Sequence, residues 1–219
     1  MLDGSTEELY EGRSFGRRSG VGLRPAVLVI DLQVGLTRPG WPLYGNHDAA
    51  IEATTQLVQG ARVVGVPVFF TAVAYQEAEV AAGCYPILLK MPAMRELLVG
   101  SPSTELDERL QRQASDFVIT KKGQSAFIGT PLAQILVGLS VDTVLVCGAN
   151  TSGCVRGTVM DATTLGYRVL LPRECLGDVT EAVHDSNMFD MDAKNADTVS
   201  LAEALSYLRT VARSPALAE

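Results

Sequence analysis

The chain has 219 residues, of which 47% are hydrophobic, and its formal net charge at pH 7 is −7. This length and apolar content predict a single domain over residues 1–219, and the acidic balance argues against a nucleic-acid partner. No apolar run approaches the roughly 20 residues needed to cross a bilayer, and residues 1–14 contain no apolar segment typical of a secretion signal. We therefore expect a cytoplasmic protein without a membrane partner.

Residues 1–23 are polar and rich in glycine and arginine, which indicates an arm that contacts another subunit. From residue 25 onward, short apolar runs alternate with amphipathic stretches. Strands are predicted at 26–30, 67–71, 117–121, 141–147, 167–171 and 197–199, and helices at 48–64, 130–139, 154–165, 180–191 and 201–212. The long irregular connection at 72–92 is interpreted either as a lid or as a subunit contact.

Continuous apolar strands joined by helices predict a mostly parallel sheet of six strands with helices on both faces. The expected fold class is therefore α/β, a three-layer α/β/α architecture that is Rossmann-like. In such sheets ligands bind at the carboxyl ends of the strands. Polar and nucleophilic residues that directly follow a strand are therefore the candidates for a functional site.

Cys154 lies in the segment 148–156, between the apolar run that ends at Cys147 and the following predicted helix. Partial positive charge at a helix amino terminus favours a thiolate and predicts a lowered thiol pKa, and the backbone N–H groups there can hold an oxyanion. Cys84 and Cys175 lack such a setting, and the four cysteines do not show the spacing of a zinc site or a disulfide scaffold. Cys154 is therefore the candidate nucleophile.

Two further residues are expected at the same edge of the sheet. Asp31 follows the first predicted strand and Lys121 ends the third, while Cys154 follows the fourth. A carboxylate beside a thiol can accept its proton, and a nearby lysine stabilises the anions. Taken singly, the three residues are equally well interpreted as a turn or helix cap, a solvated strand end and a small buried apolar residue. Their common position favours a catalytic group.

Three ordered motifs connect these residues to a known family. Residues 26–33 read A-x-L-V-I-D-x-Q, residues 121–132 read K-x-x-x-S-A-F-x-G-T-x-L, and residues 148–162 read G-x-x-T-S-G-C-V-R-x-T-x-x-D-A. With these motifs the chain resembles the isochorismatase-like cysteine hydrolases from about Arg24 to its end. Within that family it resembles the N-carbamoylsarcosine amidase and maleamate amidase group, through R-E-C-L-G-D at 173–178 and H-D-S-N-M-F-D-M-D-A-K at 184–194.

The resemblance implies the isochorismatase-like hydrolase fold and a role for each candidate. Asp31 would be the general base, Lys121 its electrostatic partner and Cys154 the nucleophile. The spacing to Phe127 in the second motif selects Lys121 rather than Lys122. The implied reaction is hydrolysis of a non-peptide amide or carbamoyl C–N bond in a small amide or ureido substrate. It would proceed through a cysteine thioester with release of ammonia or an amine, and without a cofactor.

The resemblance also implies features of the turn that carries the nucleophile. The peptide bond between Ala149 and Asn150 would be cis, although neither residue is a proline. The oxyanion hole would consist of the backbone N–H groups of Asn150 and Cys154. Assembly into a homo-oligomer, a dimer or a tetramer, is implied as well.

Residues expected to bind the substrate lie near the same edge of the predicted sheet. The aromatic residues among them fall in loops and could form the wall of an apolar pocket. Trp41 can alternatively be assigned to packing against the first helix. The expected substrate-binding residues are Gln33, Trp41, Tyr75, Phe127 and Val179.

One position departs from the family pattern. Relatives that act on small carboxylates often carry an arginine directly after the Gly-Asp pair, where this chain has Val179. A guanidinium group binds a carboxylate through two hydrogen bonds, which valine cannot do. Either the substrate lacks a carboxylate at this place, or Arg156 or Arg173 substitutes; Arg156 is otherwise interpreted as a helix residue that pairs with acidic side chains.

Three alternatives to the amidase interpretation remain at this stage. Nicotinamidases carry a metal-binding Asp/His cluster after the second strand, but this chain has only His47 and His184, so no metal is expected and His184 is interpreted as structural. Vinyl-ether hydrolases of the isochorismate type typically lack the nucleophilic cysteine, so Cys154 counts against that activity. A catalytically silent member that acts as a binding subunit would have no chemical need for all three candidate residues.

Overall fold

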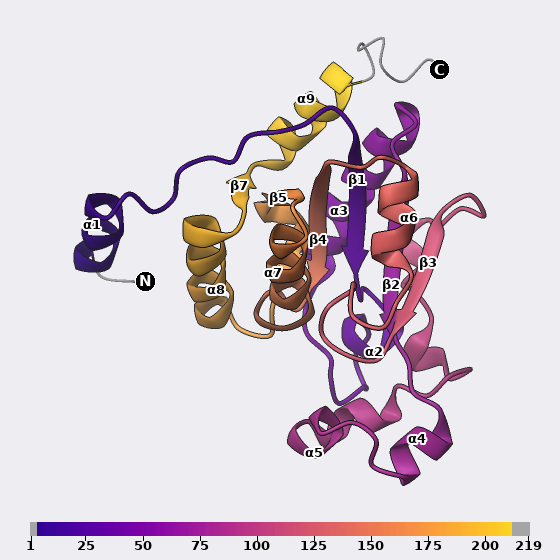
Figure 1. Cartoon of the computed structure of the whole chain (residues 1–219). Helices are drawn as coiled ribbons and strands as arrows, with labels where there is room; N and C mark the ends of the chain where they lie inside the picture. The colour runs from indigo at the N-terminus through magenta and orange to yellow at the C-terminus, as the bar shows by residue number, and fades with distance from the viewer. Residues whose placement is uncertain (1–3, 212–219) are drawn as a thin grey trace.

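The computed structural model describes residues 4–211, and its centre is one parallel sheet of seven strands (Figure 1). Residues 1–3 and 212–219, which include the two ends of the expected domain and the last residue of the expected helix at 201–212, lie outside the described part. The strands are β1 (Pro25–Ile30), β2 (Val68–Val73), β3 (Phe117–Lys121), β4 (Thr143–Ala149), β5 (Arg168–Pro172), β6 (Leu176–Gly177) and β7 (Asp197–Val199).

The strand order confirms the expected parallel α/β class. The main path runs β3-β2-β1-β4-β5-β7, and each pairing between strands is parallel. The chain therefore changes direction along the sheet between β1 and β4, which is where ligands bind in open α/β sheets. The expected number of six strands is wrong, because the sheet contains a further strand, β6. It has only two residues and pairs with the carboxyl end of β4, past the part of β4 that pairs with β5. A strand of that length has no periodicity that a sequence pattern can reveal.

Helices cover both faces of the sheet, which gives the three layers. On one face α6, α7 and α8 pack against residues such as Leu28 and Ile30, and on the other α3 and α9 pack against Val27 and Val29. The alternation follows from the period of two along a strand. No helix within residues 4–211 is long and apolar enough to span a membrane. The longer helices are α3 (Asp48–Val63), α6 (Leu132–Gly138), α7 (Arg156–Thr164), α8 (Glu181–Lys194) and α9 (Leu201–Val211).

The connection after β2 contains more regular structure than its sequence suggests. It includes α4 (Glu77–Ala81), α5 (Ile87–Lys90) and a 3-10 turn over Pro92–Glu96. Together with α2 (Val34–Thr37), α5 and this turn lie at the carboxyl edge of the sheet (Figure 1). Helices of four or five residues are too short for a helical period to appear in the sequence, so an irregular loop was the expected form.

The amino-terminal arm is an exposed helix followed by an extended segment. Helix α1 (Gly4–Gly12) lies beyond α8 at one side of the molecule (Figure 1). Its Tyr10 ring contacts Phe189 of α8 at 5.1 Å between centroids. The extended segment is held where the Asp197 carboxylate accepts hydrogen bonds from the N–H groups of Ser19 and Gly20. The arm is thus anchored along α8 and β7.

Candidate active site

Asp31 and Lys121 form a buried ion pair at the carboxyl edge of the sheet. Asp31 directly follows β1, and its Oδ2 lies 2.7 Å from Nζ of Lys121, the last residue of β3, with both side chains fully buried. The other carboxylate oxygen accepts a hydrogen bond of 2.6 Å from Thr71, which belongs to the intervening strand β2. Lys121 also donates to the carbonyl oxygens of Gly123 and Gln124. Both charges therefore have fixed partners, as buried charges require.

The structure separates the two adjacent lysines by their partners. Lys122 points away from this pair and binds Glu79 of α4 at 2.6 Å. Successive side chains of a strand point to opposite faces, so only one of two neighbouring residues can reach Asp31. The spacing argument and the geometry thus single out the same lysine, Lys121.

The backbone at the end of β4 brings the turn that carries Cys154 close to Asp31. At Gly148, φ is +111°, and a Cβ atom there would lie 2.1 Å from the carbonyl oxygen of Ile30 in β1. Only glycine permits this approach of β4 to β1. The next peptide bond, Ala149–Asn150, is cis, as the family resemblance implies. A π-helical turn over Thr151–Val155 then leads into α7.

The backbone of β6 and the side chains of Asp178, which follows β6, and of His184 on α8 hold this turn in place. The hydroxyl group of Thr151 donates to the carbonyl oxygen of Gly177 at 3.0 Å and contacts Nδ1 of His184 at 2.8 Å. The carboxylate of Asp178 accepts from the N–H of Ser152 at 2.7 Å. His184 thus contacts Thr151, whose hydroxyl group holds the turn through Gly177. This contact agrees with the structural role expected for His184. Strand β6, missed in the sequence, supplies part of this support.

Cys154 lies beside the ion pair. The pKa of its thiol is raised, whereas a position at a helix amino terminus predicts a lowered pKa. Burial, followed by the charge of Asp31, raises its pKa to about 12, and Lys121 opposes this rise only in part. The expected low pKa is therefore wrong, because loss of hydration and a neighbouring carboxylate outweigh a helix dipole. For Lys121, the carboxylate of Asp31 overcomes the opposing effect of burial and raises the pKa. At neutral pH the resting site therefore holds a neutral thiol, which lies beside the Asp31–Lys121 ion pair.

Alkylation of Cys154 by iodoacetamide is accordingly expected to be slow at pH 7 and to accelerate about tenfold per pH unit up to pH 10, in proportion to the thiolate fraction. Mass spectrometry of the peptide that contains Cys154 measures the rate, and the exposed Cys84 serves as an internal reference for the reagent. Rapid alkylation at pH 7 that does not change with pH would contradict the neutral thiol.

A small cavity adjoins Cys154. Its volume is about 170 Å³, and Asp31 and Asn150 line it together with Cys154. Leu36 and Met94 belong to an apolar cluster that also contacts Cys154. The complete lining is Asp31, Leu36, Leu43, Val73, Ile87, Met91, Met94, Leu97, Gln124, Asn150, Ser152, Gly153 and Cys154.

None of the five expected substrate-binding residues is among the described residues that line this cavity. Gln33 is buried, and its side-chain amide bonds the backbone of Val73 and Ser103. Tyr75 is fully buried behind the cavity, in the same apolar cluster as Met94. Each is thus occupied in supporting the wall from outside.

The remaining three expected residues lie elsewhere for different reasons. Phe127 packs in the core and stacks on Tyr167 at 5.9 Å between ring centroids. Trp41 is partly buried in the connection after α2, and Val179 is 60% exposed. A position near a strand end does not determine whether a side chain faces the cavity. The conformation of the loop that carries the residue determines the direction of its side chain.

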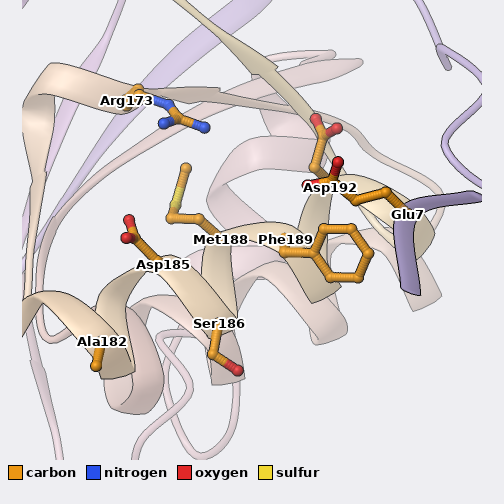
Figure 2. Close-up of a pocket in the computed structure, with 8 residues that line it drawn as sticks. All are labelled: Glu7, Arg173, Ala182, Asp185, Ser186, Met188, Phe189 and Asp192. Atoms are coloured by element: carbon orange, nitrogen blue, oxygen red, sulfur yellow. The ribbon is translucent and has the colours of Figure 1, made fainter. Parts of the chain in front are cut away.

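The two arginines considered as substitutes for a carboxylate clamp are also placed away from the cavity. Arg156 of α7 donates to Asp190 at 2.6 Å and to Asn187 at 3.0 Å, both on α8. This is the pairing with acidic side chains suggested by its sequence position. Arg173 lies at a second cavity on the outer side of α8 (Figure 2).

That second cavity is larger, about 400 Å³, and lies between α1 and α8. Figure 2 shows the Arg173 guanidinium above Met188, with Asp185 and Asp192 on either side. The cavity does not include Asp31, Lys121 or Cys154. Its described lining is Glu7, Arg173, Ala182, Asp185, Ser186, Met188, Phe189 and Asp192. The smaller cavity is therefore the candidate active site, because it alone of the two adjoins Cys154.

Two histidines, His47 and His184, lie next to the residues that hold the turn that carries Cys154. His47 is buried beside Gly177, so closely that a Cβ at that glycine would lie 2.6 Å from its Nδ1. Burial lowers the pKa of His47 against the opposing effect of Asp178, and burial likewise lowers that of His184 against the opposing effect of Asp185. Across residues 4–211, no group of three or more His, Cys, Asp or Glu side chains is arranged to hold a metal ion.

The free energy of unfolding is expected to fall as the pH is lowered from about 7.5 to 5. Because the folded protein disfavours protonated His47 and His184, protons below about pH 6.5 bind preferentially to the unfolded chain. Urea unfolding at several pH values measures this dependence, and His184→Gln should reduce its slope. Stability that stays constant or rises toward pH 5 would contradict the assignment.

Several residues of the site are not indicated by the sequence patterns. Thr71 lies within an apolar strand, and its contact with Asp31 depends on the register between β1 and β2. Ile87, Met91, Met94 and Leu97 come from the connection after β2, whose fold the sequence does not reveal. Gln124 lies inside the second motif, at a variable position, and the motif is the one signal that could have indicated it.

Comparison with known proteins gives consistent matches over most of the chain. The isochorismatase domain matches residues 25–203. The chain is 38% identical over 209 residues to the maleamate amidohydrolase of Pseudomonas putida, which covers 95% of this chain and 97% of that protein. It is 37% identical over 204 residues to the N-carbamoylsarcosine amidase of an Arthrobacter species, with 91% and 77% covered. A cysteine hydrolase from Pseudomonas syringae pv. phaseolicola shares the fold, with a TM-score of 0.83 at 23% identity over 90% of this chain and 98% of that one.

Proposed function

The chain belongs to the isochorismatase family, as its motifs predicted, and is an amidohydrolase of non-peptide C–N bonds; we propose that it cleaves a small-molecule amide or carbamoyl group through a thioester on Cys154. The observation that carries this proposal is the position of Cys154 in the lining of a cavity, beside the buried Asp31–Lys121 pair. A nucleophile, a base and a charge that orients the base are thereby in contact.

In the first half of the proposed reaction, Sγ of Cys154 attacks the carbonyl carbon while Asp31 takes the thiol proton. This coupling is needed because the pKa of Cys154 is raised to about 12, which leaves little free thiolate at neutral pH. The N–H groups of Asn150 and Cys154 stabilise the oxyanion. Asp31 then returns the proton to the leaving nitrogen, ammonia or an amine departs, and the acyl group remains on sulfur as a thioester.

In the second half, Asp31 removes a proton from water, which attacks the thioester carbonyl. The tetrahedral adduct collapses, the C–S bond breaks, and the proton on Asp31 restores the Cys154 thiol. A carboxylic or carbamic acid leaves the site. Throughout, Lys121 holds the Asp31 carboxylate in one position and balances its charge, through the contact of 2.7 Å. The reaction needs no cofactor, because each proton that is removed is returned by the same carboxyl group.

An ammonia-release screen tests the proposed activity. The panel contains carboxylate-bearing amides, neutral amides, ureido compounds and lactams, and new carboxylate is followed in parallel for the lactams. In the presence of hydroxylamine, the thioester should be intercepted as a hydroxamate. Ammonia release without any acyl transfer to hydroxylamine, and without an acyl adduct on Cys154 after acid quench, would contradict the covalent route.

The alternative activities have separate outcomes in the same screen. Pyruvate release from isochorismate, with no ammonia from any amide, would indicate the vinyl-ether activity. A folded protein that turns over neither class would indicate a silent binding subunit. Cys154 beside a base favours the amide reaction over both, because vinyl-ether cleavage by acid catalysis does not require a nucleophilic sulfur.

We further propose that residues 1–219 form one domain and that the arm at 1–23 contacts a neighbouring subunit in a dimer or tetramer. The arm presents apolar side chains to the outside, since Leu9 and Phe15 are 50% and 43% exposed. Analytical ultracentrifugation of the intact chain tests this, and a monomer at micromolar concentration would contradict it.

A further inference from the structure

The lining of the cavity at Cys154 consists of a polar and an apolar group of residues. Asp31, Gln124, Asn150, Ser152 and Gly153 line it together with Cys154. The remaining lining side chains are aliphatic or thioether groups from three segments of the chain. They are Leu36, Leu43, Val73, Ile87, Met91, Met94 and Leu97. A substrate whose carbonyl group reaches Cys154 must place the rest of its acyl group against this apolar surface.

No lysine or arginine side chain is among the described residues that line the cavity. Of the basic residues close in sequence to the lining, Lys90 and Arg95 are exposed and do not line the cavity, Arg156 is paired with Asp190, and Lys121 is paired with Asp31. Val179, where carboxylate-binding relatives carry arginine, is exposed and does not line the cavity. The negative charge nearest to a bound substrate is that of Asp31. A carboxylate placed against the apolar lining residues would lose its hydration without gaining a cationic partner among the described lining.

From these observations we propose that the substrate is an uncharged primary amide with a short apolar acyl group. This inference rests on the proposed function and specifies its substrate class. A cavity of about 170 Å³ is close to the roughly 150 Å³ that accommodates benzene in an engineered protein cavity. The acyl group therefore contains about four to six carbon atoms, as a short aliphatic chain or a single ring. This class differs from maleamate and N-carbamoylsarcosine, both of which carry a carboxylate.

A pair of substrates with the same shape tests the preference directly. In 4-methylpentanamide an isopropyl group replaces the carboxylate of succinamate, and the rest of the molecule is unchanged. We expect kcat/KM for 4-methylpentanamide to exceed that for succinamate by at least about 100-fold. From propanamide to butanamide and pentanamide, kcat/KM should rise about fourfold with each added methylene, which corresponds to about 0.8 kcal/mol.

A matched pair of methionine variants locates the acyl group. Met94→Ala enlarges the cavity at its apolar lining and should shift the preferred chain length upward by one or two carbons, as estimated from the roughly three heavy atoms removed. Met191→Ala removes an equally buried methionine from the core on the α8 side and should leave the preferred length unchanged. The same preferred length in wild type and both variants would overturn the placement of the acyl group.

Different results contradict the proposed function and the proposed substrate class. If succinamate or maleamate is hydrolysed faster than its apolar counterpart, with loss of activity in Cys154→Ala, the apolar substrate class is overturned and the amidohydrolase proposal stands. If no amide of either kind releases ammonia from folded protein, the proposed function fails and the substrate class fails with it.

Discussion

The Cys154→Ala variant is expected to hydrolyse its amide substrate at least about 10⁴-fold more slowly than wild type, while it folds normally. The thioester route has no other thiol in the described cavity lining, which contains a single cysteine. Alanine removes one atom from a partly buried position, so the unfolding midpoint should change little. Ammonia release under single-turnover and steady-state conditions measures the loss.

Cys84→Ser is the control for this variant. Cys84 is exposed and is not among the residues that line the cavity, so its replacement tests whether loss of any thiol affects the assay. Its turnover should match that of wild type. Amide hydrolysis by Cys154→Ala at the wild-type rate would remove Cys154 from the mechanism. The remaining activity would then have to come from water activated by Asp31 alone.

Asp31→Asn is expected to reduce kcat by about 10³-fold or more, with a smaller effect on KM. The amide cannot accept the thiol proton, and the raised pKa of Cys154 makes spontaneous ionisation rare at neutral pH. The same substitution leaves Lys121 buried without its carboxylate, which lowers the free energy of unfolding by about 3–5 kcal/mol. Activity must therefore be measured at a temperature where the variant is shown to be folded.

Asp116→Asn separates the two effects of this substitution. Asp116 forms a largely buried ion pair with Arg62, and neither residue lines the cavity. Its loss should lower stability in the same direction without lowering kcat. Should Asp31→Asn change substrate affinity alone, with kcat retained, Asp31 would be a binding residue and not the base.

The raised pKa of Cys154 changes how the site is understood. A low-pKa thiolate would attack without help, and Asp31 would then be needed only for later proton transfers. With a neutral thiol, the carboxylate must act in the first step, and its position relative to Cys154 becomes critical. The buried lysine fixes that position through its contact with Asp31. The labelling rate as a function of pH and the loss of kcat in Asp31→Asn are thus linked predictions.

Local sequence patterns determined the class of fold and the edge of the sheet at which the site lies. Continuous apolar runs such as residues 26–30 and 143–149 are buried on both faces, because parallel strands are covered by helices on either side. Their carboxyl ends meet at one edge, so Asp31, Lys121 and Cys154 could be predicted to lie together from their positions after strands. These features depend on neighbours within a few residues of one another, which a sequence displays directly.

Only the tertiary structure decided the ionisation of Cys154, the strand β6 and the identity of the cavity wall. The pKa of a thiol depends on its loss of water and on charges from other strands, here Asp31 and Lys121. Trp41 and Val179 follow elements near the correct edge, yet they do not line the cavity, whereas Met91 and Met94 come from a connection without a periodic pattern. Loop direction and desolvation arise from contacts between distant segments, and no local pattern encodes them.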